Sequence, residues 1–121
     1  MKNFTPVSNF FVVFFGQDSD EYGDSYPEIV DAAFKIYLED GPHYLDNLIR
    51  NIDDFRRTYP DNETAAVALN ELTRGSAGDT REYTPTLIGF LDWLSAYLKK
   101  KRDGIWFFWI LFNPDWGDIY P

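Results

Sequence analysis

Four carboxylates stand within one short polar segment, and they are the residues of this sequence best suited to chemistry. The segment is GQDSDEYGD, residues 16–24, and its acids are Asp18, Asp20, Glu21 and Asp24, with Tyr22 among them. Carboxylates at such spacing could bind a divalent cation, act as an acid and a base on a substrate, or attract a basic partner. The rest of the sequence helps to decide among a cation site, an acid/base site and a surface for a basic partner.

The first possibility is a calcium loop, because Asp18, Asp20 and Gly23 have the spacing of positions one, three and six of an EF-hand. The fifth position, however, is Tyr22 in place of Asp or Asn, and the twelfth is Ile29 in place of a bidentate Glu. We therefore expect no metal and no cofactor. A calcium-dependent acidic binding module stays open as an alternative.

Catalysis by a nucleophile or by phosphoryl transfer lacks its usual residues here. The sequence has no cysteine, one histidine at position 43, and neither a G-x-S-x-G motif nor a glycine loop that could cradle phosphate. His43 follows Gly41 and Pro42 at an expected helix start, which favours a surface position. We expect that the chain is not an enzyme, and a small hydrolase that uses two of the loop carboxylates is the remaining alternative.

The charge balance favours a basic protein as the partner. The sequence has 20 acidic and 11 basic residues, a formal net charge of −9, and the whole excess lies in residues 1–80. Such a surface repels nucleic-acid phosphates and anionic lipid, whereas it attracts basic proteins over long range. We therefore expect no direct nucleic-acid partner.

Aromatic residues beside the acids could anchor a partner, as aromatic side chains do at the centres of interfaces. We expect Tyr22 to be the central anchor of the loop. The members of a second, smaller partner-binding patch are Asp115, Trp116 and Asp118. Further aromatic residues available as anchors are Tyr26 and Tyr120. The alternative is a solvated loop whose charge only confers solubility, and composition alone does not separate the two.

The elements that must position these residues are predicted to be helices. Ser25 as a cap, Pro27 in the first turn and Gly41 past the end bound a helix over about residues 27–39. Apolar residues at helical spacing predict three more. These run over residues 42–59, from Asn62 to just before Gly75, and from Thr84 to Lys99.

Apolar runs near the two ends of the sequence carry no period that separates helix from strand. Residues 10–15, FFVVFF, are predicted to form a short buried helix, with a buried strand as the alternative. The basic run at 99–102 is expected to stabilise the C-terminal end of the last helix. Asp103 and Gly104 are expected to end that helix, with the apolar residues 105–112 forming a separate element.

We expect one domain over residues 1–121, a mainly α fold made of a compact bundle of about four to five helices, with a short C-terminal β element left open. The expected core residues are Val30, Phe34, Tyr37, Leu38, Tyr44, Leu45, Leu48, Ile49, Ile52, Phe55, Leu69, Leu72, Leu87, Ile88, Phe90, Leu91, Trp93, Leu94, Tyr97 and Leu98. The run IWFFWILF is far shorter than the roughly 20 residues of a membrane-spanning helix, and no export signal is evident. A cytoplasmic protein without a membrane partner is therefore expected.

Three short patterns resemble those of immunity proteins from bacterial contact-dependent growth inhibition systems. They are Gln17-Asp18 after an aromatic run, Tyr22-Gly23 in the acidic segment, and Trp93-Leu94 in the last predicted helix. Ser19 stands where the family pattern has a tryptophan. The resemblance covers roughly residues 9–100, and the aromatic extension 105–121 has no counterpart in it.

The resemblance implies a cytosolic antidote to a toxin domain, most often a nuclease with a basic surface. Such an antidote neutralises the toxin by covering its basic functional surface, without turnover. The residues expected to bind the toxin are the loop acids with Tyr22, and the smaller C-terminal patch. The toxin's identity is not implied, because pairs of this kind diversify to reject non-cognate partners.

Overall fold

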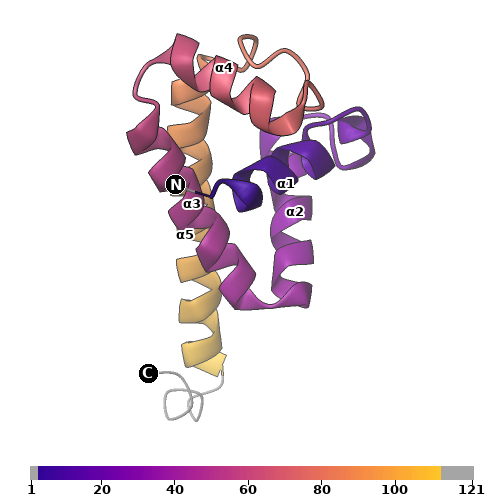
Figure 1. Ribbon diagram of the computed structural model, residues 1–121. Helices are drawn as coiled ribbons and strands as arrows, with labels where there is room; N and C mark the ends of the chain where they lie inside the picture. The colour runs from indigo at the N-terminus through magenta and orange to yellow at the C-terminus, as the bar shows by residue number, and fades with distance from the viewer. Residues whose placement is uncertain (1–2, 113–121) are drawn as a thin grey trace.

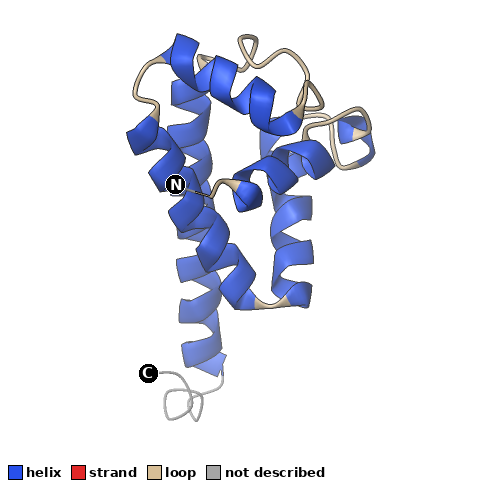
Figure 2. Cartoon of the chain, in the orientation of Figure 1, coloured by secondary structure: helices blue, strands red, loops and turns tan. Residues whose placement is uncertain are grey.

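The structure, a computed structural model, describes residues 3–112, with side chains up to residue 104, and this part of the chain is all-α. Its elements are α1 (Thr5–Phe14), the short 3-10 turn η1 (Ser19–Glu21), α2 (Tyr26–Asp40), α3 (Pro42–Thr58), α4 (Asn62–Thr73) and α5 (Leu87–Phe112). In Figure 1, α1 runs from beside α3 to the upper part of α2, α5 stands behind α3, and α4 lies across the top. Figure 2 shows no strand in the described part. The predicted mainly α bundle is confirmed.

The ends of α2 and the start of α3 follow from local sequence, as predicted. The Ser25 hydroxyl accepts a hydrogen bond from the Glu28 backbone N–H at 3.4 Å, which caps α2. Gly41 has a φ of 145°, a backbone conformation that favours glycine, and it ends α2. Pro42 then occupies the first position of α3, where its missing N–H has no partner to lose.

Of two further predicted helix starts, the one at Asn62 is correct and the one at Thr84 is displaced. Asp61, and not Asn62, caps α4 by accepting a hydrogen bond from the Thr64 N–H at 2.9 Å. Asn62 instead accepts from the Ile88 N–H at 3.0 Å, and so satisfies the first turn of α5. That helix begins at Leu87, later than the Thr84 start that we expected.

The prediction that Asp103 and Gly104 end the last helix was wrong, because α5 continues to Phe112. One glycine inside a helix costs only about 1 kcal/mol, which the good helix formers that precede it, Leu98 to Arg102, offset. The basic run at 99–102 therefore lies in the middle of α5 and not at its end. Residues 105–112 belong to this helix, and the open question of a β element beyond them falls on residues 113–121, outside the described part.

Residues of the basic run form ion pairs that join α5 to α2 and α3. Lys99 pairs with Asp53 of α3 at 2.9 Å, Lys101 with Asp31 of α2 at 2.9 Å, and Arg102 with Asp46 of α3 at 3.1 Å. Each of these ion pairs is partly exposed and contributes modestly alone. Together they fix which side of α5 faces the acids of α2 and α3.

The core is built around α1 and is unusually aromatic. Val7, Phe10, Phe11 and Phe14 of this helix are all buried. The helix packs against α3 and α4, and its Phe11 ring meets the Phe90 ring of α5 at 6.0 Å between centroids. Burial of one such side chain contributes about 1.5–3 kcal/mol, so α1 is a principal source of stability.

Most of the predicted core residues are buried or half-buried, with two exceptions. Tyr44 is 49% exposed and Leu72 is 36% exposed. Each lies on the apolar stripe of its helix, near an end that no other helix covers. Helical spacing alone does not show how far along a helix its neighbours extend. Trp93 is half-buried against the core, while Phe90 and Leu94 are inside it. None of the described helices combines the length and the apolar character needed to cross a bilayer.

Candidate functional site

The acidic loop, residues 16–25, joins α1 to α2 through a series of tight turns. The Ser19 N–H donates to the Gly16 carbonyl at 3.2 Å, Glu21 to Asp18 at 3.0 Å, and Tyr22 to Ser19 at 3.1 Å. All four acidic side chains of the predicted site in this loop are exposed. The turns use the backbone of the loop and leave its carboxylates facing solvent.

Packing against the helices fixes the shape of this loop. The Tyr22 ring lies edge-on against the Phe14 ring, with centroids 4.9 Å apart. At Gly16, an added Cβ would collide with the Val12 carbonyl oxygen, and at Gly23 it would lie 2.5 Å from the Glu28 Cβ. Both glycines therefore allow a close approach that other residues would prevent. Tyr22 is half-buried, so part of its ring stays available to a partner.

The carboxylates of the acidic loop take part in no ion pair within the described residues, whereas most of the described bases are paired elsewhere. The described pairs are Arg56–Asp92, Arg57–Asp54, Arg81–Glu63, Lys99–Asp53, Lys101–Asp31, Arg102–Asp46 and Arg102–Asp103. Lys35 is the one base between residues 3 and 40. The negative charge of the chain is thus left uncompensated at the loop.

The structure offers little to the metal and hydrolase alternatives. Among the residues that it describes, no group of three or more His, Asp or Glu side chains could hold a metal ion. Asp20 and Asp24 both line a hollow of about 500 Å³ with Ser19 and Tyr26. Both carboxylates are exposed there, whereas a catalytic acid needs a desolvated environment to stay protonated.

Tyr26 serves the fold more than the surface. Its ring meets the Phe90 ring at 4.7 Å, and its hydroxyl accepts a hydrogen bond from the Thr84 N–H at 3.3 Å. Tyr26 is half-buried, so only part of its ring stays available to a partner. Asp115, Trp116, Asp118 and Tyr120 lie outside the described residues, and the predicted second patch stays a prediction.

A groove between α1, α2 and α3 was not foreseen from the sequence. Its volume is about 820 Å³, and the residues that define it are Asn9, Val13, Phe14, Ile36, Asp40 and Tyr44. Tyr37 also lines it, and burial together with the charge of Asp40 raises the pKa of Tyr37 to about 12. One signal was present in the sequence: residues 10–15 are apolar on every side of their helix, so part of that helix must face something other than the main core.

Comparison with known proteins added no relative. The chain matches no protein-family model, no curated protein and no solved structure. The resemblance to immunity proteins therefore stays a prediction, and a functional conclusion has to rest on the geometry and charge of the described surface.

Proposed function

We propose that this chain is an immunity protein, which binds a toxin domain with a basic functional surface and neutralises it by covering that surface. The observation that carries the proposal is the acidic loop: four exposed carboxylates without an ion-pair partner in the described residues, on a loop that Tyr22, Gly16 and Gly23 hold in one shape. The toxin is most readily a nuclease, because a nuclease must present a basic surface to its substrate. The proposed location is the cytoplasm.

The charge distribution supports this function through the kinetics of association. Charged patches of opposite sign steer two proteins together and raise association rates by about 10- to 1,000-fold at low salt. A preformed loop also avoids much of the entropic cost of ordering a flexible segment on binding. The loop carboxylates would then stand where the toxin otherwise binds phosphates.

A matched pair of variants tests the role of the loop. The loop variant is Asp20→Asn, Glu21→Gln and Asp24→Asn. The control variant is Glu71→Gln, Asp79→Asn and Glu82→Gln, which changes the net charge equally at exposed positions outside the loop. The probe is the toxin domain encoded immediately upstream of the gene, with association followed by stopped flow at two salt concentrations and toxin activity followed in parallel.

We expect the loop variant to associate at least ~10-fold more slowly at low salt and to lose most of its salt dependence, whereas the control changes less than ~3-fold. Equal slowing of both variants would mean that net charge acts without a defined site. Well-folded wild-type protein that neither binds nor silences the toxin domain would refute the proposed function.

A further inference from the structure

The groove between α1, α2 and α3 concentrates apolar side chains that a stable helical bundle would ordinarily bury. Val13 is 48% exposed, Ile36 38% and Tyr44 49%, and these three come from three different helices and line the same groove. They make up half of the large apolar side chains that are exposed in the described part. Exposed apolar residues gathered in a concave site indicate a binding surface, whereas scattered ones do not.

The groove adjoins the acidic loop through one shared side chain. The Phe14 ring contacts Tyr22 of the loop at 4.9 Å and lies 6.3 Å from the Tyr37 ring on its other side. Phe14 and Tyr37 both line the groove. The loop and the groove are therefore neighbours, packed on the same buried ring, and one partner could contact both.

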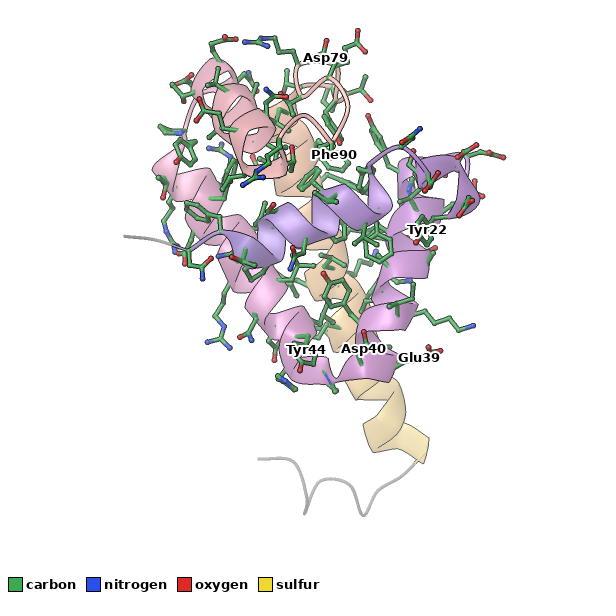
Figure 3. The ribbon with its side chains drawn as sticks, turned by 45° about the vertical axis from the view of Figure 1, so that its right-hand side comes forward. Tyr22, Glu39, Asp40, Tyr44, Asp79 and Phe90 are labelled. Atoms are coloured by element: carbon green, nitrogen blue, oxygen red, sulfur yellow. The ribbon has the colours of Figure 1, made fainter. Side chains whose placement is uncertain are left out.

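The far end of the groove is negative. Asp40 lines it and Glu39 precedes Asp40, and Figure 3 shows both beside Tyr44 where α2 meets α3. Neither carboxylate forms an ion pair with a described residue, and no Lys or Arg of the described part lines the groove. An occupant of this end is most stable when it carries a positive charge.

The walls of the groove carry amide groups that a peptide backbone could use. Asn9 of α1 and Asn47 of α3 line it, and neither side chain takes part in a hydrogen bond with the described residues. A side-chain amide can donate to a carbonyl and accept from an N–H at the same time. Amides on opposing helices are therefore suited to a peptide that lies between them.

We propose that this groove binds a peptide segment in which apolar side chains adjoin a Lys or Arg. The apolar side chains of the peptide pack against Val13, Ile36 and Tyr44, and its Lys or Arg pairs with Asp40. The source of the peptide segment rests on the proposed function, because the toxin domain that binds the acidic loop would supply the segment. The loop then governs how fast the partner associates, and the groove governs how slowly it leaves.

Two blocked peptides test the chemistry of the groove without the toxin. The probes are acetyl-Lys-Leu-Leu-Lys-Leu-amide and the same peptide with Glu in place of Lys, titrated into the ¹⁵N-labelled full chain. We expect the lysine peptide to shift the backbone signals of Val13, Ile36 and Asn47 in a saturable way with a Kd of ~1 mM or tighter. The glutamate peptide should bind at least ~10-fold more weakly, and Asp40→Asn should reduce that difference.

Ile36→Lys and Val67→Lys form a matched pair, because Ile36 is 38% exposed in the groove and Val67 is 40% exposed on α4 outside it. Ile36→Lys should weaken the lysine peptide at least ~10-fold, and Val67→Lys should leave it unchanged. The inference is overturned if no saturable shift appears, if the shifts centre elsewhere, if both peptides bind equally, or if the two variants behave alike.

Dissociation of the upstream-encoded toxin domain separates this inference from the proposed function. Ile36→Lys should raise the dissociation rate at least ~10-fold and leave the salt dependence of association intact, which is the reverse of the loop variant. Peptide binding without toxin binding would refute the proposed function and support the groove as a peptide-binding site. If Ile36→Lys leaves toxin binding unchanged and no peptide binds, the groove is refuted as a binding site and the proposed function stands.

Discussion

Substitution of Asp53 offers a sharp test of how α5 is held in the bundle. Asp53 of α3 accepts a hydrogen bond from the Ser95 hydroxyl at 2.6 Å and another from the Lys99 ammonium at 2.9 Å, both on α5. Burial alone would raise the pKa of Asp53. The two hydrogen bonds and the charges of Lys99 and Arg57 outweigh burial and hold the pKa below its ordinary value of 3.8.

Asp53→Asn keeps the shape of the side chain and removes its charge. A hydrogen bond to a charged group contributes about 1.5–3 kcal/mol when buried, and the partial exposure of this site reduces that figure, so we expect a loss of ~1–2 kcal/mol at pH 7. Urea unfolding measures it. The control is Asp54→Asn at the next position, whose pair with Arg57 is exposed on one helix and contributes at most ~0.5 kcal/mol.

The dependence on pH gives the result that would refute the reasoning. Because the pKa of Asp53 is lower in the folded than in the unfolded chain, its stabilisation is present above the ordinary value of 3.8 and is lost as pH falls through the folded value. The difference between wild type and Asp53→Asn should therefore shrink below about pH 4. A difference that is the same at pH 3 and pH 7, or an equal loss in Asp54→Asn, would show that the charge is not responsible.

Two further predictions concern the core. Tyr83→Phe should lower the free energy of unfolding by ~1–2 kcal/mol, because the Tyr83 hydroxyl donates to the buried Ala77 carbonyl at 3.0 Å; an unchanged urea midpoint would show that this bond contributes nothing. Phe90→Ala should cost ~3–5 kcal/mol, since the ring is 1% exposed and contacts rings from α1 and α2; a loss below ~1 kcal/mol in the same assay would contradict the packing described above.

Parts of the fold that depend on local chemistry could be predicted from the sequence. The start of α2 follows from Ser25, and its boundary with α3 follows from Gly41 and Pro42, each of which acts within one turn of its own position. The way α5 docks on α2 and α3 could not be predicted in this way. Ion pairs to Asp31, Asp46 and Asp53 hold that helix, and these residues are distant from it in the sequence.

The same distinction applies to the candidate site. The acidic loop could be found because its carboxylates are neighbours in the sequence. The groove could not, because Val13, Ile36 and Tyr44 come together only when three helices pack. Helical spacing placed Tyr44 on an apolar stripe but carried no information on which part of that stripe another helix would cover.

The central place of α1 has a consequence for how the chain is made. Phe11 is translated early, yet the α5 ring that packs against it, Phe90, is translated much later. With roughly 80 residues between Phe11 and Phe90 and a synthesis rate of about 5–20 residues per second, the nascent chain lacks this contact for ~4–16 s after Phe11 is made. The native bundle, with Phe90 seated against Phe11, can therefore form only after α5 has emerged.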